Sequence, residues 1–179
     1  MEGYMARFYL IRHGKHTYES VSGRNFMGHG LDLAPLTDEG IHQAIECSKD
    51  ERLKECELII SSPYTRAMQT SAILSKNLGI DMSVEIDLRE QELDLTYQAR
   101  SIEDLNKIAL EEQKHNGVIS PDRNLKWEPR CDVKKRVLDV LGRYANHKKV
   151  IVVCHGMIIH CLTGLIGIPN CSIHAIDIE

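Results

Sequence analysis

Two histidines, each followed by a glycine, stand at the ends of apolar runs in this 179-residue chain. Arg12-His13-Gly14 follows the apolar residues 8–11, and His155-Gly156 follows residues 150–154. Short apolar runs of this kind predict buried strands, so each imidazole is expected where a strand leaves the sheet. Two imidazoles beside an arginine offer a nitrogen nucleophile and a neutralising charge, and this combination suits chemistry on phosphate.

The elements that must position these residues alternate between strands and helices. Strands are expected at residues 6–11, 58–60, 82–86, 150–154 and 172–178. Helices are expected from an N-cap at Thr37 into residues 54–56, over 63–78 ending at Gly79, from Ser101 to about 115, and over 132–144 and 157–166. Residues 15–35 and 117–129 are expected to be loops.

This alternation predicts an α/β fold, a doubly wound three-layer sandwich with a mainly parallel central sheet. The length fits a single domain over residues 1–179. In such sheets ligands bind at the carboxyl ends of the strands, and both His-Gly sequences and Ser61-Ser62 fall at such ends. The predicted topology therefore gathers these polar residues at one edge.

The charge balance excludes several classes of partner. The 22 basic and 26 acidic side chains give a net charge of −4, so we expect no sequence-wide attraction to nucleic acid or to an anionic membrane. Residues 150–168 lack Lys, Arg, Asp and Glu over about the length of a membrane span. Their β-branched start and the break at His155-Gly156 favour a buried strand followed by a buried helix.

The cysteines and the N-terminus indicate the compartment. Six cysteines are widely scattered without a C-x-x-C pair, which favours free thiols. Only four consecutive apolar residues separate Arg7 from Arg12, too few for a signal peptide. We therefore expect a cytoplasmic protein.

Several motifs occur in a fixed order along the chain. After Arg12-His13-Gly14 come Leu36-Thr37-Asp38-Glu39-Gly40-Ile41-His42-Gln43-Ala44, then Ser61-Ser62-Pro63-Tyr64-Thr65-Arg66-Ala67-Met68-Gln69-Thr70, Leu88-Arg89-Glu90 and finally His155-Gly156. In this order and over nearly its whole length, the chain resembles the histidine phosphatase superfamily, the phosphoglycerate-mutase-like group.

The resemblance implies a role for each of five residues. His13 would be the nucleophile that accepts the phosphoryl group, and His155 would stabilise its oxygens in the transition state. Arg12 and Arg66 would bind the phosphate, since paired guanidiniums match its geometry. Glu90 would supply the proton to the leaving group and afterwards activate water. Glu92 is a competing candidate for that last role. The scheme requires no metal and no other cofactor.

The sequence departs from the family pattern around these residues. Many members continue the first motif as E-T-x-x-N, but Glu19 stands here at the position of that asparagine, and the glycine- and tryptophan-rich run after L-x-E is absent. Thr17 or Asn25 is a candidate to replace that asparagine as a phosphate contact. Lys15, Arg24, Arg89 and Arg100 are candidate substrate contacts for a second acidic group.

Together these features predict a metal-independent phosphomonoesterase that hydrolyses a small phosphorylated metabolite through a phosphohistidine at His13. The short chain, which lacks the longer tail of the cofactor-dependent mutases, favours a phosphatase. The alternatives are a phosphoglycerate-type mutase, a phosphate- or phosphopeptide-binding protein without turnover, and a protein phosphatase. The sequence indicates no particular oligomeric state.

Overall fold

The computed structural model describes residues 5–22, 28–118 and 127–178. Its central sheet has the strand order β3-β2-β4-β1-β5. All neighbouring strands are parallel except β5, which pairs antiparallel with β1. The strands are β1 (Ala6–Arg12), β2 (Leu58–Ser61), β3 (Met82–Val84), β4 (Lys149–Cys154) and β5 (Ile173–Ile178).

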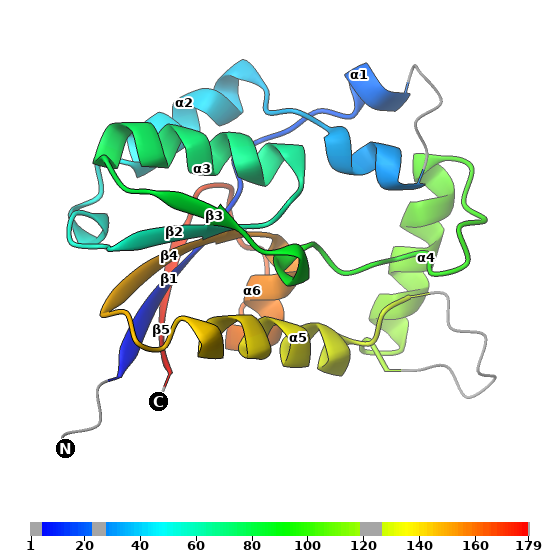
Figure 1. Ribbon diagram of the computed structural model, residues 1–179. Helices are drawn as coiled ribbons and strands as arrows, with labels where there is room; N and C mark the ends of the chain where they lie inside the picture. The colour runs from blue at the N-terminus through cyan, green and yellow to red at the C-terminus, as the bar shows by residue number, and fades with distance from the viewer. Residues whose placement is uncertain (1–4, 23–27, 119–126, 179) are drawn as a thin grey trace.

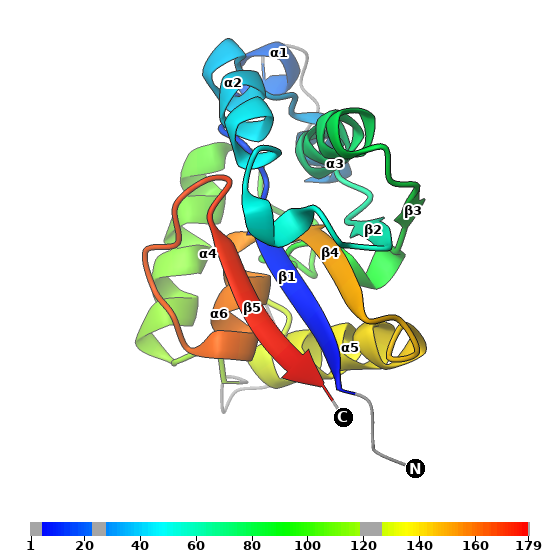
Figure 2. The same cartoon turned by 90° about the vertical axis from the view of Figure 1, so that its left-hand side faces the viewer.

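The described residues form six α-helices: α1 (Glu19–Ser22), α2 (Asp38–Cys47), α3 (Thr65–Leu78), α4 (Ile102–Lys114), α5 (Arg130–Arg143) and α6 (Gly156–Thr163). Helices α2 and α3 cover one face and α5 and α6 cover the other (Figures 1 and 2). Helix α4 stands apart from both layers, beyond the end of the sheet at which the parallel strands finish (Figure 1). The predicted three-layer α/β sandwich is confirmed.

Strand β1 shows why the sheet takes two helical layers. Phe8 and Leu10 belong to the core cluster formed with α5 and α6. Tyr9 and Ile11 belong to the opposite cluster, which includes residues of α2 and α3. Because successive strand residues point to opposite faces, an unbroken apolar run needs a cover on both sides.

The predicted helix caps occur where the sequence placed them. The side chain of Thr37 accepts a hydrogen bond from the backbone N–H of Gly40, and that of Ser101 accepts one from Asp104. Gly79 ends α3 in the left-handed conformation, at φ 68°. The capping rules therefore predicted these helix boundaries, each of which depends on a single residue.

Other boundaries differ from the predictions. Helix α2 ends at Cys47 and does not reach residues 54–56, because the Asp50 side chain caps a separate 3₁₀ turn, Glu51–Leu53. Helix α6 ends at Thr163, where Gly164 turns with φ 75°. The predicted loop at residues 15–35 contains α1 and the 3₁₀ turn Gly28–Leu33.

The uncharged residues 150–168 divide between β4 and the eight-residue helix α6. In the part of the chain that the structure describes, no helix is both long enough and apolar enough to cross a membrane. All six cysteines are free thiols.

Candidate active site

The two His-Gly sequences meet because their strands are neighbours. Strands β1 and β4 are parallel, with Arg12 paired to Cys154, so His13 and His155 leave the sheet side by side. Their ring centroids lie 5.1 Å apart. His13 is 3% exposed and His155 is fully buried. The structure thus brings both predicted imidazoles to one edge of the sheet.

The hydrogen bonds of His13 fix its protonation state. Its Nδ1 lies 2.8 Å from the carbonyl oxygen of Gly14, which can only accept, so Nδ1 carries the proton. Its Nε2 accepts a hydrogen bond from Nε of Arg66 at 3.2 Å. Burial, and then the charge of Arg66, lower the pKa of His13 to about 2. His13 is therefore a neutral imidazole whose Nε2 lone pair faces a guanidinium.

Several buried donors around His13 have no hydrogen-bond partner among the described residues: Nε of Arg12, Nη1 of Arg66 and Nδ1 of His155. Arg66 lies in the first turn of α3 and is only 5% exposed. A cation there opposes the helix dipole, and each unsatisfied buried donor costs about 1–3 kcal/mol. An anion with several acceptor oxygens would satisfy all of these donors at once.

Ser62 contacts one ring nitrogen of His155 and leaves the other without a partner among the described residues. Its hydroxyl oxygen accepts the backbone N–H of Tyr64 at 3.3 Å and lies 2.7 Å from Nε2 of His155. A hydroxyl that donates to Nε2 leaves the ring hydrogen on Nδ1, and this tautomer makes Nδ1 a donor. Burial, followed by the neighbouring charges, keeps the pKa of His155 well below its ordinary value. Sequence reasoning noted Ser62 in a motif but assigned it no task.

Glu90 is held against the last His-Gly sequence. Its two carboxylate oxygens accept the backbone N–H groups of Gln91, at 3.0 Å, and of Met157, at 3.4 Å. The residue retains partial solvent exposure, yet protein surrounds its carboxyl, and this burial raises the pKa of Glu90. A raised pKa favours the protonated carboxyl, which is the form that a general acid needs. Glu92, the competing candidate, lines the same pocket as Glu90.

Two glycines allow the His13 loop to lie against α2. A Cβ on Gly14 would stand 2.5 Å from the carbonyl oxygen of Gly40, and a Cβ on Gly40 would stand 2.0 Å from that of Lys15. Gln43 accepts the backbone N–H of Lys15 at 2.9 Å. The second motif thus holds the loop and does not contact the reacting group.

The third motif and the C-terminal segment hold the same loop from other sides. Thr70 accepts the backbone N–H of Gly14 at 3.0 Å, and the amide of Asn170 donates to the carbonyl of His13 at 2.8 Å. The backbone N–H of Cys171 donates to the carbonyl of Arg12 at 2.8 Å. These supports join segments far apart in sequence, so no local pattern could have revealed them.

The other predicted contacts lie elsewhere or are engaged. The ammonium of Lys15 pairs with Glu39 of α2. Thr17 accepts the backbone N–H of Glu19 at 3.2 Å, and Glu19 is exposed. Arg24 and Asn25 lie outside the described residues. Arg89 pairs with Asp87 at 2.7 Å, and Arg100 is exposed.

His16 is a neighbour of the site that sequence reasoning overlooked. Its ring lies 5.1 Å from that of His13, edge-on, and its Nε2 is buried without a partner among the described residues. Burial, and then the charges of Arg66 and Arg12, lower the pKa of His16 to about 4. Its only sequence signal is its position three residues after His13. Across the described ranges, no three His, Cys, Asp or Glu side chains are grouped as metal ligands.

A neutral buried imidazole lies at the carboxyl edge of the parallel sheet among cationic donors that have no partner in the described part of the chain, and this arrangement suits an anion such as a phosphate. Over residues 8–179 the sequence matches the histidine phosphatase superfamily (branch 1). The chain therefore belongs to that superfamily of enzymes, and the predicted resemblance is confirmed.

Individual relatives carry names of both mutases and phosphatases. "Probable phosphoglycerate mutase GpmB" of Proteus mirabilis (strain HI4320) is 29% identical over 194 residues, which span 98% of this chain and 86% of that protein. A mycobacterial glucosyl-3-phosphoglycerate phosphatase in complex with VO3 is similar in structure, with a TM-score of 0.72, 23% identity and coverage of 95% and 92%. A putative alpha-ribazole-5'-P phosphatase from Escherichia coli str. K-12 substr. MG1655 has a TM-score of 0.67, 22% identity and coverage of 97% and 91%.

Proposed function

We propose that this protein is a metal-independent phosphomonoesterase that transfers the phosphoryl group of a small phosphorylated metabolite to Nε2 of His13 and then to water. The observation that carries the proposal is the neutral imidazole of His13, whose unprotonated Nε2 faces Arg66 beside donors that no described residue satisfies. We place this activity in the cytoplasm, in line with the scattered free cysteines.

In the first step Nε2 of His13 attacks phosphorus, and the P–N bond forms as the bond to the ester oxygen breaks. Arg12, Arg66 and the Nδ1–H of His155 receive the phosphoryl oxygens, whose charge they stabilise in the transition state. The protonated Glu90 gives its proton to the departing oxygen, so the product leaves as an alcohol.

In the second step the Glu90 carboxylate takes a proton from water, whose oxygen attacks phosphorus. The P–N bond breaks, phosphate is released, and both His13 and Glu90 return to their starting protonation states. Water supplies every atom that the reaction consumes, and Arg12, Arg66 and His155 stabilise the charge, so the proposed scheme uses no metal ion and no organic cofactor.

Hydrolysis of p-nitrophenyl phosphate in EDTA tests the proposal. We expect turnover by the parent protein and none by His13→Ala. His42→Ala, which removes an exposed histidine of α2, is the matched control and should retain full activity. Inactivity of the parent, or undiminished activity of His13→Ala, would contradict the proposal.

A mutase is the second candidate, favoured by the name of the 29%-identical relative. In that reaction the phosphohistidine returns its phosphoryl group to a bound intermediate instead of to water. Incubation with 3-phosphoglycerate, with and without 2,3-bisphosphoglycerate, distinguishes the two. Isomer without free phosphate identifies a mutase, and free phosphate identifies a phosphatase.

A further inference from the structure

The segment that carries Glu90 belongs to no helix or strand. It follows the 3₁₀ turn Ile86–Leu88, and residues 89–92 lie outside the regular elements. Its backbone carbonyl groups therefore need partners from elsewhere in the chain. A carboxyl that must stay aimed at a reacting oxygen also needs a fixed backbone beneath it. The contacts that hold this segment thus bear directly on Glu90.

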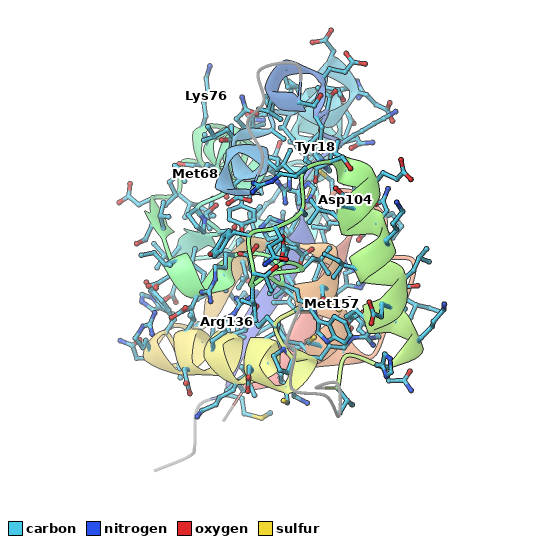
Figure 3. The ribbon with its side chains drawn as sticks, turned by 90° about the vertical axis from the view of Figure 1, so that its right-hand side faces the viewer. Tyr18, Met68, Lys76, Asp104, Arg136 and Met157 are labelled. Atoms are coloured by element: carbon cyan, nitrogen blue, oxygen red, sulfur yellow. The ribbon has the colours of Figure 1, made fainter. Side chains whose placement is uncertain are left out.

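Arg136 of α5 supplies three of these partners. Its Nη1 donates to the carbonyl oxygens of Asp87 and of Arg89, the latter at 2.9 Å, and its Nη2 donates to that of Glu90 at 3.2 Å. The side chain is 11% exposed and lies on the side of α5 that faces the rest of the molecule (Figure 3). One guanidinium therefore binds the backbone both before Glu90 and at Glu90 itself.

Glu128 directs this guanidinium toward the segment. Its two carboxylate oxygens accept Nε of Arg136 at 2.7 Å and Nη2 at 2.9 Å. Together with the three carbonyl groups, these two bonds engage all five N–H groups of the guanidinium. Burial opposes ionisation of Glu128, but the hydrogen bond and the charge of Arg136 outweigh it and lower the pKa of Glu128. Glu128 is therefore a carboxylate at neutral pH.

Glu128 also holds the segment on the far side of Glu90. Its backbone N–H donates to the carbonyl oxygen of Glu92 at 2.7 Å, and one of its carboxylate oxygens accepts the backbone N–H of Glu92 at 3.2 Å. The buried side chain of Gln91 donates from Nε2 to the carbonyl oxygen of Glu128 at 2.7 Å. Arg136 and Glu128 together therefore fix the backbone on both sides of Glu90.

The carboxyl of Glu90 is held by a different set of groups. One of its oxygens accepts the backbone N–H of Met157, in the first turn of α6. The charges of Arg66 and Arg12 lower the pKa of Glu90 against the larger effect of burial. Arg136 instead contacts the backbone below this carboxyl. The groups that aim Glu90 are thus separate from those that would bind phosphate.

We infer that Arg136 is a positioning residue, oriented by Glu128, that clamps residues 87–92 and keeps the Glu90 carboxyl aimed at the leaving oxygen. The inference rests on the acid role of Glu90 in the proposed function. Arg136→Lys keeps the charge but presents three N–H groups on one nitrogen, so it cannot make the same five hydrogen bonds. Alanine at position 136 would leave the Glu128 carboxylate buried without its partner, so the tests use conservative variants.

Two esters of similar size test the clamp. Benzyl phosphate releases an alkoxide that needs the proton of Glu90, whereas p-nitrophenyl phosphate releases a phenolate that leaves without one. We expect Arg136→Lys to lower kcat/KM for benzyl phosphate about 10-fold or more, and that for p-nitrophenyl phosphate by no more than a few-fold. Glu128→Gln should shift the ratio of the two values in the same direction.

This ratio distinguishes a positioning role from a merely structural one. Both values come from one sample, so their ratio does not depend on the fraction of folded protein. Arg143→Lys is the matched control, because Arg143 lies in the same helix and pairs with Glu85 at an exposed position. It should leave the ratio unchanged. Equal losses on both esters in Arg136→Lys would overturn the inference.

A double-mutant cycle determines whether Arg136 acts through Glu90. In Glu90→Gln the proton donor is already lost, so the addition of Arg136→Lys should not change the ratio further. A second drop of similar size in the double variant would show that Arg136 acts by another route, and the inference would be wrong.

Hydrogen exchange separates failure of this inference from failure of the proposed function. In Arg136→Lys the peptide that covers residues 86–92 should exchange faster than in the parent, while β1 and β4 exchange at the parent's rate. If the parent hydrolyses neither ester but this exchange pattern occurs, the phosphatase proposal fails and the clamp stands. If the parent hydrolyses both esters but the exchange of residues 86–92 is unchanged, the clamp alone fails.

Discussion

Replacing Gly14 with alanine tests how rigidly the nucleophile is held. The new Cβ would lie 2.5 Å from the carbonyl oxygen of Gly40, about 0.9 Å short of the 3.4 Å at which ordinary contact begins. That oxygen belongs to the backbone of α2 and cannot rotate away. The loop is also tied by hydrogen bonds to Thr70 and Asn170, so the displacement must pass to His13.

The size of this displacement sets the expected loss. A misplacement of about 1 Å at a reacting group can cost about 10²-fold in rate. We therefore expect Gly14→Ala to lower kcat for p-nitrophenyl phosphate about 100-fold, and to lower stability by about 1–3 kcal/mol through overpacking. Steady-state kinetics and urea unfolding measure the two effects separately.

Gly142→Ala is the matched control. Gly142 lies in α5, and a Cβ there meets nothing within 4 Å. Alanine should raise stability by about 0.5–1 kcal/mol and leave kcat unchanged. A folded Gly14→Ala protein with the parent's kcat would refute the reasoning, because it would show that the loop can move away from α2 without displacing His13. If Gly14→Ala does not fold, Gln43→Ala, which removes the hydrogen bond to the backbone of Lys15 and one to the exposed Glu39, should still lower kcat measurably.

Three further outcomes follow from the site. Glu90→Gln should slow esters of poor leaving groups far more than aryl phosphates, which depart without a proton; equal losses would move the acid role to another residue. Ser62→Ala should lower kcat about 10-fold or more, because it removes the hydrogen-bond partner of Nε2 of His155. The buried hydroxyl of Ser71 has no partner among the described residues, so Ser71→Ala should leave kcat unchanged. Acid should destabilise the fold. Burial and the charge of Arg66 lower the pKa of His13 to about 2, from an ordinary 6.5. Below pH 6.5 the unfolded chain therefore binds a proton that the native state does not bind. The contribution of His13 to the free energy of unfolding is then complete above pH 6.5 and falls toward lower pH. In urea unfolding measured at several pH values, His13→Asn should reduce the slope of this free energy against pH by up to about 1.4 kcal/mol per pH unit.

Much of the fold and site could be predicted because the relevant signals are local. The apolar runs before His13 and His155 identified two parallel strands, and parallel neighbours end at the same edge. Thr37, Gly79 and Ser101 marked helix ends through their own hydrogen bonds or conformation. Arg66 in a first helical turn indicated an anion because its charge opposes the dipole there.

The remainder depended on contacts between distant segments. The tie from Asn170 to His13 spans 157 positions, and that from Thr70 to Gly14 spans 56. The early end of α2 arose from competition between one long helix and the Asp50 cap, which helical periodicity does not reveal. The pocket beside Arg66 joins residues of the 3₁₀ turn Gly28–Leu33 with residues that follow Glu90, so its lining became visible only in three dimensions.

The position of β1 in the sheet affects how the protein folds during its synthesis. Both partners of β1, strands β4 and β5, are synthesised after it, and β4 begins only at Lys149. At roughly 5–20 residues per second, the ribosome needs on the order of 10 s to reach these partners. During that interval β1 has neither of its hydrogen-bonding neighbours. The enzyme must therefore close its sheet late, and a nascent chain that has not yet made its last two strands cannot hold His13 in place for catalysis.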